Sequence, residues 1–169
     1  RRAERRPGGG RPAACNEGRS VAGVVEAVGG WLVAAAFLAV SATALSSAMV
    51  LAMLTEVGAP LGAGDMARMI IDDLAGFGPL YGALIAVALA VAFLAAAVVT
   101  RAVRPLRSVV FAVAGAAAMA VMLTLMEQVF FGVQLVAGAR TPPGFLMQAG
   151  AGAAAGLVFA ALTPAPERR

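Results

Sequence analysis

One carboxylate inside an apolar segment is the sharpest candidate for chemistry in this sequence. Glu127 directly follows the uncharged run 108–126. At about 1.5 Å per helical residue it lies roughly 28 Å from the start of that run, near the far edge of a hydrocarbon layer of about 30 Å. Ionisable side chains in membrane-spanning segments are costly, so they are usually paired or functional. Glu127 therefore needs a partner or a role.

Two other polar residues belong to the same candidate cluster. Gln148 stands four residues before Gly152, and helical spacing places both on one face. Arg140 lies between the two apolar segments that contain Glu127 and Gln148. We favour a structural clamp that joins Glu127 to Gln148 or Arg140. A substrate or proton site built on Glu127 is the alternative.

Most other chemistry is excluded by the residue types. The sequence has no histidine and a single cysteine, Cys15. Disulfides, Cys/His zinc sites, bis-His haem and Ser-His or Cys-His nucleophile pairs are therefore absent. Asp72 and Asp73 are adjacent, and neighbouring helical residues diverge by about 100°, so they do not converge on a metal ion. We predict a non-enzymatic protein with no cofactor and no metal.

The composition indicates a protein of the lipid bilayer. Hydrophobic residues make up 61% of the 169 residues and charged residues 13%, against about a quarter charged in soluble domains. The domain 31–163 contains four apolar segments of spanning length, 31–54, 79–100, 108–130 and 144–163. The sequence therefore predicts an all-α integral membrane four-helix bundle.

The first apolar segment leaves one alternative open. Arginines precede it and Ala42-Thr43-Ala44 resembles a cleavage site, as in a signal peptide. We favour a membrane span, because the apolar core of a signal peptide is only about 7–15 residues long. Trp31 at its start and Tyr81 in the second segment are predicted to anchor at the membrane–water interfaces. The hydroxyls of this segment, Ser41, Thr43, Ser46 and Ser47, are predicted to bond back to their own helix.

The segments outside the spans are predicted as tails and one short helix. Residues 1–30 form a disordered basic tail and a short interfacial segment that Gly29-Gly30 ends, and 164–169 form a basic tail. An alternative for residues 1–20 is that they precede the natural start of the protein, which would then lie at or near Val21. The stretch 65–75 is predicted as an amphipathic helix on the outer face. Asp65 is predicted to cap the start of that helix. Its apolar face is formed by Met66, Met69, Ile70 and Leu74, and its polar face carries Arg68 and Asp72.

The distribution of arginine predicts the orientation. All of the 13 basic residues except Arg68 and Arg140 lie in the amino tail, the turn 101–107 or the carboxy tail. With four spans these three segments share one side, which the positive-inside rule makes the cytoplasm. We therefore expect cytoplasmic termini in a multi-pass protein of the bacterial inner membrane. Basic residues at span ends also argue against nucleic acid as a partner.

Small residues at four-residue spacing predict close helix packing. Such spacing lets helix backbones approach in lipid. The match Gly152-xxx-Gly156 is attributed to packing within the bundle, with a dimer face as the alternative. The predicted packing residues are Gly82, Ala86 and Ala90 in the second span, Ala112, Ala116, Ala120 and Thr124 in the third, and Gly152, Gly156 and Ala160 in the fourth.

Two short runs resemble a group of known sequences. The runs 72–82 (DDLAGFGPLYG) and 136–141 (VAGART) resemble uncharacterised four-span proteobacterial inner-membrane proteins. The resemblance implies the same topology and carries no function.

These patterns together predict an accessory or assembly protein of the inner membrane. Its expected partners are the lipid bilayer and either a larger membrane or periplasmic protein or a second copy of the chain. A small transporter or channel that uses Glu127 is the alternative function.

Overall fold

The computed structural model describes residues 13–56, 58, 62–76, 78–129 and 139–163, and these residues form helices and short connections without a strand. Four of the helices are long and apolar enough to cross a membrane, so the chain is a multi-pass membrane protein of the all-α class. The helices are α1 (Ala13–Glu56), α2 (Ala63–Gly76), α3 (Gly78–Ala102), the 3₁₀ turn η1 (Arg104–Leu106), α4 (Arg107–Val129) and α5 (Pro142–Leu162).

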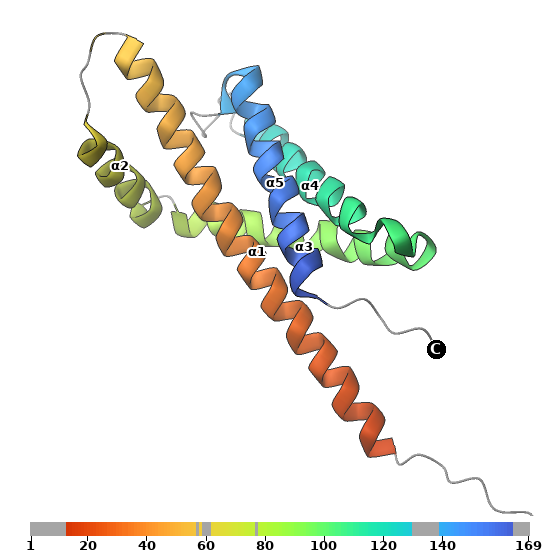
Figure 1. The fold of residues 1–169 in the computed structure, drawn as a ribbon. Helices are drawn as coiled ribbons and strands as arrows, with labels where there is room; N and C mark the ends of the chain where they lie inside the picture. The colour runs from red at the N-terminus through yellow and green to blue at the C-terminus, as the bar shows by residue number, and fades with distance from the viewer. Residues whose placement is uncertain (1–12, 57, 59–61, 77, 130–138, 164–169) are drawn as a thin grey trace, which may run out of the picture.

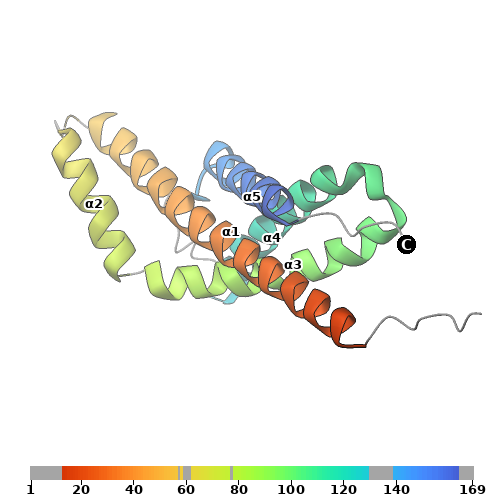
Figure 2. The same ribbon diagram turned by 60° about the horizontal axis from the view of Figure 1, so that its bottom comes forward.

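The four long helices pack into one bundle. α4 and α5 lie side by side in both views, and α1 crosses α3 (Figure 1 and Figure 2). α1 and α5 run antiparallel, because Gln148 near the start of α5 bonds to Ala42 while Gly30 contacts Thr163 just past its end. Every long helix contributes to the core, with Leu38, Ile85, Met119 and Ala155 each at most 1% exposed.

Local sequence explains where α5 begins. Thr141 is the N-cap in an extended conformation, and its hydroxyl accepts a hydrogen bond from the Gly144 amide at 3.3 Å. Pro142 and Pro143 occupy the first helical positions, where an absent N–H costs nothing. The predicted span 144–163 therefore starts slightly earlier than expected.

The helix α1 continues through Gly29-Gly30, and the prediction that this pair ends a helix is wrong. Gly30 is buried, and a Cβ atom placed there would come within 3.0 Å of Thr163 Cγ2. Glycine costs about 1 kcal/mol in a helix relative to alanine, and here it lets α1 contact the end of α5. Within the predicted tail 1–30, residues from Ala13 onward are thus helical, and 1–12 lie outside the described residues.

The two aromatic residues predicted as interfacial anchors are both packed against other helices of the bundle. Tyr81 is only 2% exposed, so its ring cannot face the headgroups. Trp31 is half-buried, and its indole Nε1 donates a hydrogen bond to the Ala86 carbonyl of α3 at 3.0 Å. Buried Trp and Tyr side chains usually find a hydrogen-bond partner for their polar group. For Trp31 that partner is the Ala86 carbonyl of the neighbouring helix α3.

The short helix α2 covers the predicted stretch 65–75. Met69 and Ile70 are half-buried, whereas Arg68 and Asp72 are exposed, as an amphipathic helix requires. The side chains of Met66 and Leu74 lie outside the described part. α2 joins the end of α1 to the start of α3 (Figure 1).

Candidate functional site

The side chain of Gln148 points into the bundle, as predicted. Its side chain is 1% exposed, and Nε2 donates to the Ala42 carbonyl at 2.9 Å and to Ser46 Oγ at 2.8 Å. Both acceptors belong to α1, so this amide ties α5 to α1. The other amide atom, Oε1, is buried and has no hydrogen-bond partner within the described part of the chain. A buried acceptor without a donor costs about 1–3 kcal/mol.

The other two members of the predicted cluster lie closer to the rim. Glu127 is half-buried near the end of α4, and Arg140 is exposed just before α5. Neither is free of contacts. The hydrogen bonds described for Gln148 run to α1, so they do not include Glu127. A clamp between Glu127 and Arg140 stays a prediction.

Three of the hydroxyl groups predicted to bond within the first span have described hydrogen bonds. Ser41 Oγ donates to the Phe37 carbonyl at 2.8 Å and Thr43 Oγ1 to the Ala39 carbonyl at 2.8 Å, which confirms the predicted bonds within the helix. Ser46 differs, because its oxygen accepts the bond from Gln148. Its role as a contact between helices was missed, since nothing in the sequence shows which helix is the neighbour of α1.

Three glycines bring α4 and α5 into backbone contact. A Cβ atom on Gly152 would overlap the carbonyl oxygen of Gly115, and one on Gly156 would overlap that of Phe111. Gly152 and Gly156 therefore pack within the bundle, against α4. Gly82 and Ala86 lie at the contact between α1 and α3, where a Cβ on Gly82 would be 3.9 Å from the Ala39 side chain.

The stripe predicted on the third span is displaced on the real helix. Thr124 is exposed and bonds to its own helix, with Oγ1 3.0 Å from the Ala120 carbonyl. The buried face of α4 instead runs through Phe111, Gly115 and Met119. Small residues occur all around α4, so their spacing alone could not select the face; the glycines opposite on α5 do.

A second polar contact, which the sequence did not predict, holds the other end of α5. Arg107 Nη1 donates to the Ala160 carbonyl at 2.7 Å, and Nη2 donates to Thr163 Oγ1 at 2.5 Å. The guanidinium lies 5.3 Å from the ring centre of Phe111. A cation next to the carbonyls of a helix end also opposes the negative end of the helix dipole. Arg107 thus acts as a C-terminal clamp on α5.

Three phenylalanines pack beneath this clamp. Phe93 of α3 stacks on Phe159 of α5 with ring centres 4.4 Å apart. Phe111 of α4 completes the group at 4.9 Å from Phe159 and 5.6 Å from Phe93. Such pairs contribute about 0.5–1.5 kcal/mol beyond the buried area. The cluster therefore joins three helices at one level of the bundle.

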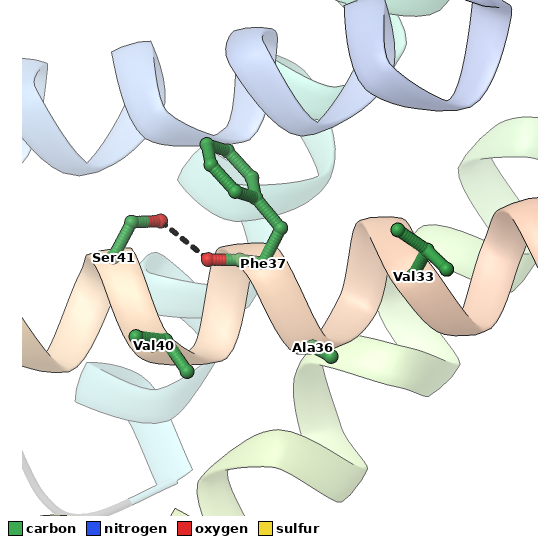
Figure 3. Close-up of a pocket in the computed structure, with 5 residues that line it drawn as sticks. All are labelled: Val33, Ala36, Phe37, Val40 and Ser41. Atoms are coloured by element: carbon green, nitrogen blue, oxygen red, sulfur yellow. Dashed lines mark hydrogen bonds between the residues drawn. The ribbon is translucent and has the colours of Figure 1, made fainter. Parts of the chain in front are cut away.

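Among the described residues, α1 carries one side of an open groove on its surface. It has a volume of about 480 Å³ and is lined by Val33, Ala36, Phe37, Val40 and Ser41 (Figure 3). The hydroxyl of Ser41 is bonded to its own helix, so the groove offers an apolar surface. In the part of the chain that the structure describes, no three His, Cys, Asp or Glu residues gather as a metal site would need.

Comparison with known proteins finds no matching family model, no matching curated protein and no matching solved structure.

Proposed function

We propose that this chain is a non-enzymatic accessory or assembly protein of the bacterial inner membrane, and that α1 is the helix that contacts its partner. The observation that carries the proposal is an exposed apolar seam on α1. Val21, Val25, Val28 and Leu32 recur at the four-and-three spacing of a helix seam, and they are 61%, 63%, 48% and 53% exposed.

The position of this seam sets it apart from an ordinary lipid-facing surface. α5 has 21 residues and therefore spans about 32 Å, close to the hydrocarbon thickness. Gly30 lies against the end of α5, so the part of α1 before Gly30 extends beyond that level. Figure 1 shows α1 continuing well past the end of α5. The whole helix of 44 residues measures about 66 Å, more than the roughly 40–45 Å of a bilayer with its headgroups.

Exposed valines on the part of α1 that extends past the end of α5 favour a protein partner. Each large aliphatic side chain gains about 1.5–3 kcal/mol when it is fully removed from water. A partner helix that covers Val21, Val25 and Val28 would be stabilised by removing these side chains from water. The seam belongs to a membrane-anchored helix, so the partner meets it already oriented. These features suit an assembly role.

Site-specific photo-crosslinking in cells tests this function. A photoreactive residue at Val25 is expected to give one discrete adduct with a different membrane protein. The matched control is Leu94, which is 71% exposed on α3 within the span and is expected to react with lipid alone. Reaction of Val25 with lipid alone would refute the accessory role. An adduct with a second copy of the chain would favour an oligomeric pore.

The alternative is a small transporter or channel that uses Glu127. It is supported by the half-buried carboxylate on α4 and by the buried Oε1 of Gln148, which has no hydrogen-bond partner among the described residues. The variant Glu127→Gln keeps the shape and loses the titratable charge. Under the accessory role it should fold and support the host normally, whereas Glu127→Leu should lower stability by about 1–3 kcal/mol. A Glu127→Gln protein that folds normally but fails in the cell would favour transport.

A further inference from the structure

The turn between α3 and α4 carries two arginines that the bundle does not use. Arg101 lies in the last turn of α3, Arg104 opens η1, and both side chains are exposed. Within the described residues neither guanidinium makes a hydrogen bond or an ion pair, in contrast to Arg107. The sequence contains no acidic residue between Asp73 and Glu127. Among the residues that the structure describes, the positive charge of this turn is therefore available to an external anion.

An apolar ridge on α3 leads directly to Arg101. The exposed residues Val87, Val91, Leu94 and Val98 follow one another at spacings of four, three and four, and they are 64%, 65%, 71% and 63% exposed. Arg101 comes three residues after Val98, so helical geometry places it on the same face. A molecule that lies along this ridge would meet a guanidinium at its end.

A second ridge leads away from Arg104 along α4. Leu106, Val109 and Val113 stand at spacings of three and four and are 49%, 54% and 63% exposed. Arg104 precedes Leu106 by two residues. Each of the two helices therefore presents an exposed apolar ridge that ends at the turn beside an arginine.

The turn between the two ridges is held in place from inside the bundle. Arg107 binds the Ala160 carbonyl and Thr163 Oγ1, and its guanidinium stacks over Phe111. The amide of Arg107 also bonds back to the Arg104 carbonyl. A site whose parts are fixed before binding loses less conformational entropy when the ligand arrives.

We propose that Arg101 and Arg104 bind the phosphate of an anionic phospholipid whose acyl chains lie along the ridges of α3 and α4. The charge of the headgroup matches the unpaired guanidiniums, and the chains match the exposed valines and leucines. Arginine is suited to phosphate because its planar fork donates two parallel hydrogen bonds. The inference does not depend on the proposed accessory role.

The test measures lipid binding to the full chain in a neutral detergent by native mass spectrometry. The probe is phosphatidylglycerol, with phosphatidylcholine of the same chain length as the comparison. Near a membrane surface each arginine contributes about 1 kcal/mol, a factor of about five in affinity. We expect Arg101→Gln and Arg104→Gln each to weaken phosphatidylglycerol binding about fivefold and the double variant about thirtyfold. Phosphatidylcholine binding should change far less.

Two controls make the outcome specific. Arg68→Gln removes an exposed arginine from α2 and should leave phosphatidylglycerol binding unchanged. The Lys variants of Arg101 and Arg104 keep the charge but lose the planar fork, so they should recover part of the affinity, which also shows that the turn still folds. Equal weakening by Arg68→Gln, or no weakening by the double variant, would overturn the proposal. Competition by inorganic phosphate at the same concentration as the lipid would assign the arginines to a free anion instead.

Discussion

The contact between α4 and α5 makes a sharp prediction about single methyl groups. In Gly152→Ala, the new Cβ would lie 3.0 Å from both the carbonyl carbon of Gly115 and the Cβ of Met119, and closer still to the Gly115 oxygen. Carbon atoms pack best at about 3.5–4.0 Å, so the two helices must separate. Overpacking of this kind costs about 1–3 kcal/mol.

Gly150 is the matched control on the same helix. A Cβ atom at Gly150 meets nothing within 4 Å, and alanine is a better helix former than glycine by roughly 0.5–1 kcal/mol. Gly150→Ala should therefore be neutral or stabilising. The two variants add the same methyl group to one helix, and their free energies of unfolding should differ by about 1.5–4 kcal/mol.

Thermal unfolding in mild detergent, followed by the fluorescence of the single tryptophan Trp31, measures this difference. A gap of that size corresponds to midpoints on the order of 5–10 °C apart. The double variant Gly115→Ala/Gly152→Ala should cost less than the two single changes together, because the first change already separates the helices. Equal midpoints for Gly152→Ala and Gly150→Ala would refute backbone contact between α4 and α5.

Three further predictions concern the other contacts and the topology. Thr163→Val removes the hydroxyl that accepts from Arg107 and should lower the free energy of unfolding by about 1.5–3 kcal/mol; unchanged stability in detergent would contradict the clamp. Trp31→Phe keeps the ring contact but loses the hydrogen bond to α3, so about 0.5–1.5 kcal/mol should be lost, which chemical denaturation can measure against the wild type. An impermeant maleimide added to intact cells should label a cysteine placed at Gly64 and leave Cys15 unlabelled, because Cys15 is predicted to face the cytoplasm. Labelling of Cys15 would contradict the predicted orientation.

The four spans could be predicted from the sequence because lipid imposes a local rule. A segment in hydrocarbon must satisfy its backbone hydrogen bonds within itself, so a long uncharged run is a helix whatever surrounds it. α3, α4 and α5 accordingly begin and end close to the predicted limits. The start of α5 is equally local, since Thr141 and Pro142 provide its cap and first residue.

The rotation of each helix could not be predicted in the same way. A span that is apolar all round has no polar face to mark its outer side. The even spacing of Ala112 and Ala116 on α4 pointed to a face next to the one that is buried, and Gly115 was overlooked. The contact of Gly115 with Gly152 selects the face, and that contact exists only when both helices are in place.

The polar partners were decided entirely by the order of helices in the bundle. The sequence alone determined that Gln148 is directed inward and that Arg107 stands at the end of a span. Gln148 bonds to a carbonyl 106 residues away on α1, and Arg107 to one 53 residues away on α5. A hydrogen bond acts only over about 3 Å, so its partner is known only once the neighbouring helix is known. Tertiary packing supplies that neighbour, because it depends on the fit of all four surfaces at once.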